Sequence, residues 1–435
     1  VLKESVNASF TKKTVELKQA INEAFQNNNE LSAFKNHLLS TQTNIGIERS
    51  LYLPRLKFEE SYTNTHIPVQ VISFLLNQSN IKDVDLDLAS QNNPNPINNF
   101  WTLVSIDQKI LDLKALWAIE IAKKTYRVKN FDYLRKMEEI AKKVALAYFD
   151  VDSDKKKVSA AKDSVKDAEE ILEVVKHKYS NKKALYSDVL RASSILSNSK
   201  QRLVTIQREL DISKRLLGLK MGYDRSVDII DKKTSGLSLK SKDYYKNASL
   251  TRNDAKALET QYEKAKTNVK IATAGYCPTL DINASYNLFD PNVPFGYKGD
   301  SYLAAAFFRW DIFDGLKRNY EIKRAKYDSK EAYENLEWFK KNVSFQVYSA
   351  YTKIEGELEN IKISRETLKT SQEGRTKVLE EYKNSPYITI SDLLNTQISL
   401  DQARVNYILQ ENSAIDSLIE LSFVSGTILK DCLGK

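Results

Sequence analysis

The stretch CPTLDINASYNLFDPNVPFGYKGDSYLAAAFFRWDIFDG, residues 277–315, predicts a β-hairpin. After Pro278 every second side chain is apolar, namely Leu280, Ile282, Ala284, Tyr286 and Leu288. This period of two is typical of a strand with one apolar and one polar face. A turn rich in Pro, Asn, Asp and Gly follows at 290–300, and the alternation resumes from Tyr302 to Ile312. We therefore expect two strands of about ten residues, the length of a tilted membrane-spanning strand.

A second hairpin is expected near the start of the chain. Leu53-Pro54-Arg55-Leu56 matches Cys277-Pro278-Thr279-Leu280, and Ile110-Leu111-Asp112 matches Ile312-Phe313-Asp314. The first offset is 224 residues and the second is 202, so the first half holds 22 extra residues. The hairpins are predicted at about 55–110 and 279–313. The excess predicts a long extracellular loop over roughly 66–98.

Long helices follow each hairpin. The stretch 113–179 contains no Pro and no Gly, and 316–382 contains no Pro. Heptad spacing of apolar residues continues on both sides of 180–184 and predicts an antiparallel helical hairpin. The second half has a matching break at Asn384-Ser385-Pro386. Helical hairpins are thus expected at about 113–217 and 316–425.

These landmarks describe a duplicated chain. Ser187-Asp188-Val189-Leu190 also recurs, as Ser391-Asp392-Leu393-Leu394. We expect a first structural repeat over 1–218 and a second over 248–435, each with a helix, a β-hairpin and a helical hairpin. The segment 219–247 is expected to be a polar linker or equatorial segment with little core.

Composition excludes several function classes. There are 66 Lys and Arg against 57 Asp and Glu, a net charge of +9, but the Lys residues alternate with acids along helices. A solvated helix surface is favoured over nucleic-acid binding. The two Cys and three His are scattered, so no metal site and no cofactor are expected. No Gly-rich loop or nucleophile motif indicates an enzyme. The apolar runs are too short for a transmembrane helix.

Membrane physics limits the assembly. Four strands cannot lie in a bilayer as an open sheet, because the edge N–H and C=O groups would be unsatisfied. Barrels are known from about eight strands upward. If the hairpins span a membrane, the chain must therefore oligomerise, as an eight-stranded dimer or a twelve-stranded trimer.

The sequence resembles the TolC-like outer membrane efflux protein family over roughly residues 15–426. The matching motifs are Asn28-Asn29-Glu30-Leu31, Tyr52-Leu53-Pro54, Leu216-Leu217-Gly218-Leu219, Trp310-Asp311-Ile312-Phe313-Asp314-Gly315, Tyr179 with Ser187-Asp188-Val189-Leu190-Arg191-Ala192, and Tyr382 with Ser391-Asp392-Leu393-Leu394. Each motif is short, but their order, duplication and spacing together are specific.

The resemblance implies a mostly α-helical α+β membrane protein. Its homotrimer would form a twelve-stranded β-barrel, four strands per chain, continued into the periplasm by a barrel of antiparallel coiled-coil helices. The function implied is the passive outer-membrane exit duct of a tripartite efflux pump or type I secretion system, with a periplasmic gate. The implied partners are a periplasmic adaptor, an inner-membrane transporter and outer-membrane lipid, but no nucleic acid.

The resemblance also implies roles for particular residues. Asp392 matches an acidic gate position that faces the pore, and Asn395 replaces a second acid one turn further on. Asp188 and Tyr382 match positions that tie the inner helical hairpin to its neighbours. The helical turns that would meet the adaptor contain Asn181, Lys182, Lys183, Ser385 and Pro386.

Simpler interpretations remain open for these positions. Asp188 and Asp392 each follow a Ser at a helix start, so each carboxylate could only stabilise the first helical turn. Tyr382 continues a heptad stripe and could be a packing residue. Tyr302, Phe308 and Trp310 are expected in an aromatic girdle at the membrane interface, with plain packing as the alternative. For the whole chain, the alternative to a duct is a soluble or membrane-surface coiled-coil scaffold.

Overall fold

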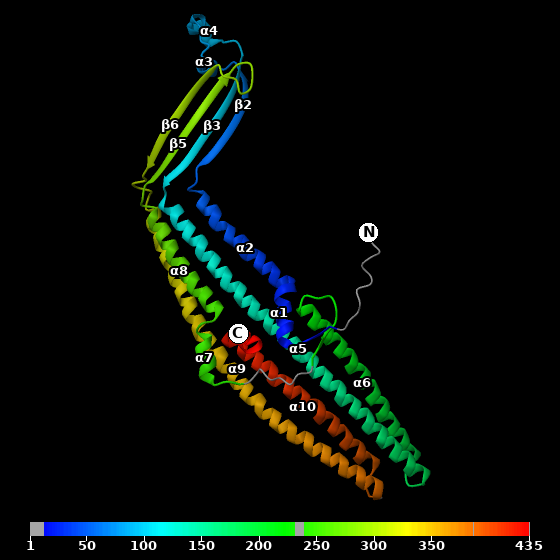
Figure 1. Ribbon diagram of the computed structural model, residues 1–435. Helices are drawn as coiled ribbons and strands as arrows, with labels where there is room; N and C mark the ends of the chain where they lie inside the picture. The colour runs from blue at the N-terminus through cyan, green and yellow to red at the C-terminus, as the bar shows by residue number, and fades with distance from the viewer. Residues whose placement is uncertain (1–12, 231–238, 386, 435) are drawn as a thin grey trace. The chain divides into compact units, whose positions relative to one another are not determined.

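The computed structural model describes residues 13–230, 239–385 and 387–434 (Figure 1). The chain divides into two compact units. The first comprises Val1–Leu38, Lys129–Leu258 and Asn335–Lys435, and the second comprises Leu39–Val128 and Glu259–Glu334. The second unit contains the main sheet, and the first contains the turns of both helical hairpins.

The second unit is built on one antiparallel sheet with the strand order β2-β3-β5-β6. The strands are β2 (Arg55–Thr65), β3 (Ile97–Leu111), β5 (Thr279–Asp290) and β6 (Gly299–Arg309). Each hairpin pairs its own strands, and β3 pairs with β5, so the two halves of the chain share one sheet (Figure 1). The four strands predicted from the alternation are confirmed.

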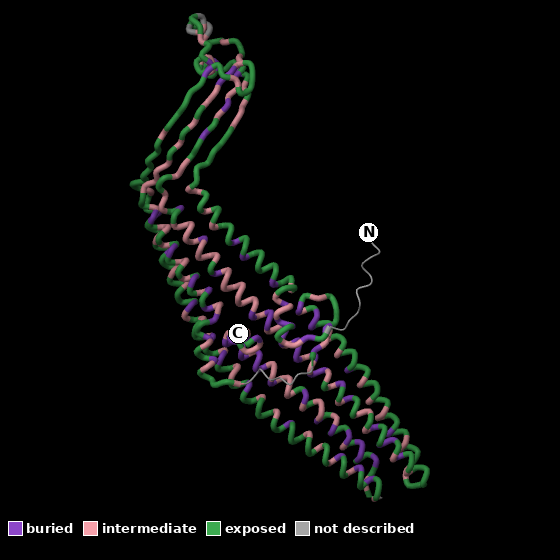
Figure 2. The backbone as a smooth tube through the Cα atoms, viewed as in Figure 1, coloured by how far each residue is buried: buried purple, intermediate pink, exposed green. Residues whose placement is uncertain are grey.

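The strand register collects apolar side chains on one face of this sheet. Phe58 is opposite Val104, Val104 is opposite Tyr286, and Tyr286 is opposite Tyr302. The next row contains Leu56, Ile106, Ala284 and Ala304. Much of this face is uncovered: Tyr302 is 82% exposed, and Figure 2 shows mainly exposed and half-buried residues along the strands. We call it the apolar face.

The opposite face of the sheet, here called the polar face, has a different composition. One row across it contains Lys57, Ser105, Ser285 and Leu303. Near the helical end of the strands, Arg309 Nη1 lies 2.7 Å from Asp281 Oδ2. Asn283 Nδ2 donates to Asp107 Oδ1 over 2.8 Å. Charged and amide groups therefore pair with one another on this face.

The insertion between β2 and β3 is not an irregular loop throughout. It contains helix α3 (Pro68–Asn77), the short 3-10 helix η1 (Asp83–Leu86) and helix α4 (Leu88–Asn92). Pro68 lies in the first turn of α3, where its missing N–H breaks no helical hydrogen bond.

The helices follow the expected duplication. The longest are α5 (Leu113–Ser180) and α9 (Lys317–Asn384), each of 68 residues. They are followed by α6 (Tyr186–Lys220) and α10 (Ile390–Ser425), and two shorter helices, α2 (Asn29–Ser50) and α8 (Asn253–Ala274), precede the hairpins. The α10 helix ends at Gly426, whose φ of 77° is easily adopted only without a side chain.

The core of the first unit includes a segment that the sequence analysis took for a linker. Strands β1 (Lys13–Val15) and β4 (Val227–Ile229) pair in parallel, beside α1 (Leu17–Asn27) and α11 (Ile428–Leu433). Met221, Val227 and Ile229 are buried in this core. Tyr245, in α7 (Lys242–Ser249), is buried against Val347 and other residues of α9 and α10.

The expectation of little core in 219–247 is therefore wrong for its described residues. Apolar residues alternate over only a few positions here, as in Val227-Asp228-Ile229, so the pattern is too short to indicate a core strand. Met221, Val227 and Tyr245 are buried by elements distant in the sequence, which a local pattern cannot indicate.

Candidate functional site

The turns of the two helical hairpins are joined by one apolar cluster in the first unit, here called the tip cluster. It takes residues from α5, α6, α9 and α10, namely Ile171, Leu172, Val175, Ala192, Leu379, Tyr382, Ile390, Leu393 and Leu394. These positions are buried because the heptad stripes of both hairpins converge there. The cluster therefore holds the two hairpins together near their ends.

A polar network also joins the two hairpins, further from their turns than the tip cluster. We call it the tip network. The buried Arg375 of α9 contacts Glu170 Oε2 of α5 at 2.8 Å and donates through Nε to Gln397 Oε1 of α10 at 3.0 Å. Arg404 Nη1 lies 2.6 Å from Asp167 Oδ2. The pKa of Glu170 is lowered: burial opposes ionisation, but Arg375 and Lys383 outweigh it.

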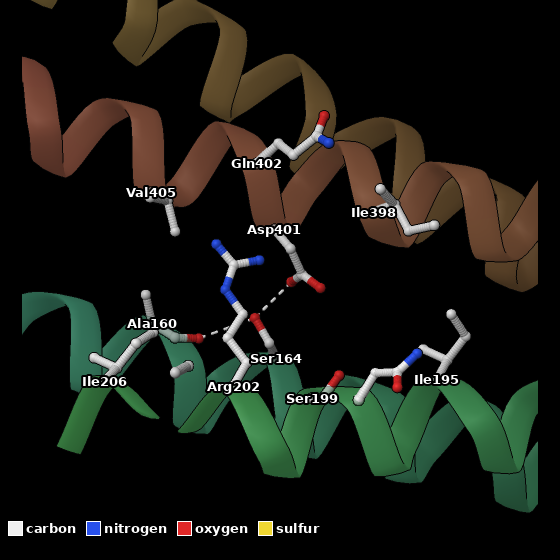
Figure 3. A pocket seen from close by; sticks show the side chains of 12 residues that line it. Ala160, Ser164, Ile195, Ser199, Arg202, Ile206, Ile398, Asp401, Gln402 and Val405 are labelled. Atoms are coloured by element: carbon white, nitrogen blue, oxygen red, sulfur yellow. Dashed lines mark hydrogen bonds between the residues drawn. The ribbon is translucent and has the colours of Figure 1, made fainter. Parts of the chain in front are cut away.

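A groove lies beside the network, between α5, α6 and α10 (Figure 3). Its volume is about 240 Å³, and its apolar lining includes Ala161, Ile206 and Ile398. Ser164 donates to Asp401 Oδ1 over 2.5 Å, and burial raises the pKa of Asp401. Figure 3 shows the Arg202 side chain extending toward Asp401 from α6.

Asp392 lies at the start of α10 with its side chain exposed. Its Oδ2 accepts hydrogen bonds from the Thr389 hydroxyl at 2.6 Å and the Thr389 N–H at 3.0 Å. These bonds, the hydroxyl first, lower the pKa of Asp392. Asn395, one turn further on, is also exposed. The helix-start role of Asp392 is thus present in the single chain, and it does not conflict with a place in the pore.

Asp188 and Tyr382 lie close to one another across the two hairpins. The half-buried Asp188 accepts from the Leu185 N–H at 3.1 Å, again at a helix start. Tyr382 is buried in the tip cluster, and burial followed by the charge of Asp188 raises its pKa. Lys178 lies 4.1 Å from the centre of the Tyr382 ring and also donates to the Tyr382 carbonyl oxygen.

The predicted turn residues lie at the two ends of the hairpins. Asn181, Lys182 and Lys183 are exposed in the turn between α5 and α6, and Lys182 has a φ of 58°. Ser385 is half-buried after α9, and its hydroxyl accepts from the Tyr387 N–H at 3.2 Å. Pro386 lies outside the described residues. The charged side chains Lys182 and Lys183 are therefore available to a partner.

The predicted girdle residues all have large exposed surfaces. Tyr302 and Phe308 lie on the apolar face of β6, and Phe308 is 64% exposed. Trp310 follows β6 and donates through Nε1 to the Tyr276 carbonyl oxygen at 3.0 Å. An exposed aromatic body with its polar atom bonded near the strand end suits a membrane interface.

Sequence reasoning missed two groups of polar residues. The tip network was not predicted, although Gln397 and Arg404 interrupt an apolar stripe of α10, which is a usable signal. The second group is Asp150, Asn412 and Asp416, where Asn412 Nδ2 lies 3.4 Å from Asp150 Oδ1 and 3.3 Å from Asp416 Oδ2. Asp150 and Asp416 belong to different halves, so only tertiary structure brings them together.

Among the described residues, no group of three or more His, Cys, Asp and Glu side chains has the arrangement to hold a metal ion. None of the helices in the described ranges is both long enough and apolar enough to cross a membrane.

Comparison with known proteins identifies the family. The family described as "Outer membrane efflux protein" matches residues 20–222 and 244–427, which is most of the chain. The chain belongs to the outer membrane efflux protein family. A comparison with curated proteins finds no match.

Solved structures of outer-membrane channels share the fold of this family member. VceC of Vibrio cholerae has a TM-score of 0.76 at 16% identity, covering 94% of this chain and 96% of that one. CmeC of Campylobacter jejuni has a TM-score of 0.74 at 14% identity, covering 94% and 85%. MtrE of Neisseria gonorrhoeae, described as an open state, has a TM-score of 0.73 at 16% identity, covering 95% and 89%.

Family membership confirms the predicted function and location of the chain. This outer membrane efflux protein is an exit duct of tripartite pumps in the outer membrane, and it is not an enzyme. The coiled-coil scaffold alternative is not supported. The mostly helical fold, with four strands per chain in its main sheet, is also confirmed.

Proposed function

We propose that this chain forms one third of a trimeric duct whose sheet closes only in the assembly. The observation that carries the proposal is the four-stranded sheet with one uncovered apolar face. Its edge strands are β2 and β6, and among the described strands neither has an outer neighbour. In lipid such edges must be paired, and three copies of four strands give twelve, an even number within the range of outer-membrane barrels.

The assembly is tested by mass. Protein purified in a mild detergent should scatter light as three chains, and the barrel should stay trimeric in SDS at room temperature. A monomer mass in several detergents would overturn the trimer. An eight-stranded dimer would appear as two chains and would require a different closure.

We further propose that the hairpin ends form the resting gate of the duct at its periplasmic end. The tip cluster and the tip network support this proposal, because both link α5 to α9 and α10 within one chain. The pore would widen only when such links loosen. Three copies of Asp392 would then ring the constriction, with Asp188 and Tyr382 tying neighbouring helices and Asn395 leaving a second ring uncharged.

The partner at this end is a periplasmic adaptor that couples the duct to an inner-membrane transporter. The exposed turn residues Asn181, Lys182 and Lys183, with Ser385, are the proposed contacts. Photo-cross-linking groups at Lys182 and Lys183 should capture the adaptor in cells, while a group at the exposed Val293, between β5 and β6, should not. Equal capture from all three positions would argue against a specific tip contact.

The membrane contact is assigned to the apolar face, with Tyr302, Phe308 and Trp310 at the interface. In vesicles with brominated lipids, quenching of tryptophan fluorescence should fall when Trp310 is replaced by Phe. The same replacement at Trp338, which is exposed on α9, should not reduce the quenching. If the quenching falls only when Trp338 is replaced, α9 and not the end of β6 contacts the lipid, and the assignment is wrong.

The two halves are proposed as structural repeats over 1–218 and 248–435, with 219–247 between them. The paired elements support this: β2-β3 corresponds to β5-β6, α5 to α9 and α6 to α10. The helices α5 and α9 are also equal in length, at 68 residues each.

A further inference from the structure

We propose that helix α3 forms a second constriction of the duct, an uncharged apolar ring at the extracellular mouth. The inference rests on the proposed trimeric duct. Between Ser61 and Ile81 the chain has no Asp, Glu, Lys or Arg, although 28% of all residues are charged. Seven of the ten residues of α3 are Pro, Val, Ile, Leu or Phe. Its three polar side chains, Gln70, Ser73 and Asn77, lie on one side of the helix, and the remaining surface is apolar and is not expected to face water.

Both ends of α3 are anchored to the sheet. At its start, the Gln70 side chain accepts a hydrogen bond from the Thr65 hydroxyl, at the end of β2, over 2.9 Å. At its end, Gln78 Nε2 donates to Asn98 O and Asn99 Oδ1, at the start of β3, both over 2.9 Å. A side chain at Gly299, which begins β6, would collide with the Asn77 carbonyl oxygen.

These anchors place α3 across the end of the sheet, from β2 toward β6 (Figure 1). Ten helical residues are about 15 Å long, and the outer strands of a four-stranded sheet are about 14 Å apart. The helix therefore has the length to cross the end of the strands of one chain. In three chains, three such helices would surround the mouth.

The anchors also decide on which side of the sheet α3 lies. Thr65, Asn99 and Phe289 have side chains on the polar face, by alternation along their strands, and all three are buried. At the same end of the sheet, Tyr62 and Tyr302 on the apolar face are largely exposed. The polar face of an outer-membrane barrel points inward. Helix α3 thus lies on the lumen side and not on the lipid side.

One stripe of α3 remains uncovered and points away from its supports. Val71, Ile72 and Leu75 line a cavity of about 250 Å³, whose other wall is formed by Asp85, Gln91 and the returning segment 93–97. Val69 and Leu76, two turns apart on another side, are 78% and 56% exposed. We assign this stripe to contact with the α3 stripes of the other two chains, around the axis of the duct.

Such a ring would select among solutes by how strongly they are hydrated. Apolar constrictions obstruct hydrated ions because water leaves them, whereas apolar and amphipathic solutes can pass. The ring would therefore admit outgoing amphipathic compounds and slow the entry of charged solutes from outside. A gate at the periplasmic tips does not provide this discrimination at the outer surface.

The test measures access to the lumen from outside the cell. A reporter cysteine replaces Ser285, which lies on the polar face in the middle of β5, and Cys277→Ser removes the exposed native thiol. A charged, membrane-impermeant thiol reagent is added to intact cells, and the labelling rate of the reporter is measured. Leu76→Ser and Val69→Ser should each raise the rate several-fold. Leu88→Ser, at an equally exposed apolar residue of α4, is the matched control and should leave it unchanged.

A cross-linking experiment tests directly whether the α3 helices of neighbouring chains lie next to one another. Oxidation of Leu76→Cys should join neighbouring chains into covalent dimers in the SDS-resistant trimer, and oxidation of Leu88→Cys should not. If the trimer forms but neither cross-linking nor labelling responds at position 76, α3 lies outside the pore and the inference is overturned while the duct stands. If α3 instead cross-links to lipid probes, it is an interfacial helix and the inference fails. A monomer mass would overturn both proposals.

Discussion

Asp416 is a residue whose burial makes stability depend on pH. Burial and then the charge of Asp150 raise its pKa to about 6, with Lys353 opposing, and one of its oxygens has no partner within the described residues. Because this pKa lies above the ordinary value of 3.8, folding favours the protonated carboxyl. The resulting stability is present at low pH and lost as pH rises through about 6.

We expect Asp416→Asn to unfold at a higher temperature than the wild type at pH 8 and at the same temperature at pH 4. The measurement is thermal unfolding of detergent-solubilised protein across this range. Asp211→Asn, at an exposed position of α6, serves as the control and should show little pH-dependent difference. A constant offset between wild type and Asp416→Asn at every pH would contradict the assigned pKa.

Asp392 serves as a helix cap and, in our proposal, as a charge in the pore. Asp392→Asn should reduce cation preference, measured as the reversal potential across a salt gradient in a planar bilayer, and leave the trimer intact. Thr389→Ala separates the two roles, because it removes the capping hydroxyl and keeps the charge. Since the Thr389 hydroxyl lowers the pKa of Asp392, wild-type selectivity should persist to mildly acidic pH. If Thr389→Ala reproduces the effect of Asp392→Asn, Asp392 acts only as a cap.

At the scale of elements, the tip network determines how firmly the two helical hairpins hold together. Arg375→Ala leaves Gln397 Oε1, in a side chain only 1% exposed, without its partner. An unsatisfied buried polar group costs about 1–3 kcal/mol. We expect the variant to open more often in single-channel recordings and to lose protection from hydrogen exchange near the tips.

The control for this prediction is Lys362→Ala on the same helix. Lys362 pairs with Glu359, and both side chains are largely exposed. Surface pairs of this kind contribute about 0–1 kcal/mol, so channel opening should not change. An equal effect from both variants would show that general weakening of α9, and not the tip network, governs opening.

At the scale of the whole molecule, a charged replacement should have different effects on stability on the two faces of the sheet, even at neighbouring residues. Ala304 lies on the apolar face opposite Ala284, and Ala305 lies on the polar face opposite Asn283. Ala304→Arg should cost about 2–4 kcal/mol in the membrane, whereas Ala305→Arg should cost little. The measurement is unfolding by denaturant in lipid vesicles, with the fraction of SDS-resistant trimer as a second readout. If Ala305→Arg lowers the free energy of unfolding more than Ala304→Arg does, the polar face contacts the lipid and the apolar face lines the pore, contrary to our assignment.

Much of the fold is predictable from local patterns in the sequence. The strands after Pro54 and Pro278 follow from the period of two, and the helices α5 and α9 follow from long heptad patterns without Pro. The duplication predicted a matching turn in each helical hairpin. These features depend on residues close in sequence, so their periodicity specifies helix or strand whatever the distant environment.

The candidate site is less predictable, because its contacts are between distant residues. Sequence patterns indicated Asp392 and Tyr382 but could not show that Lys178 lies against Tyr382. Likewise, Arg375 and Glu170 are paired across 205 positions of the chain. No period connects such residues, and their pairing depends on how the two hairpins pack.

The sequence by itself therefore determined the type, length and duplication of the elements, and through its motifs the family. Only the tertiary structure decided that Met221, Val227 and Tyr245 belong to cores, that Asp150 meets Asp416, and that α3 is held on the polar face. The physical reason is that burial and ion pairing depend on which surfaces meet. Local propensity is set within a few residues, whereas these contacts exist only after distant segments have packed.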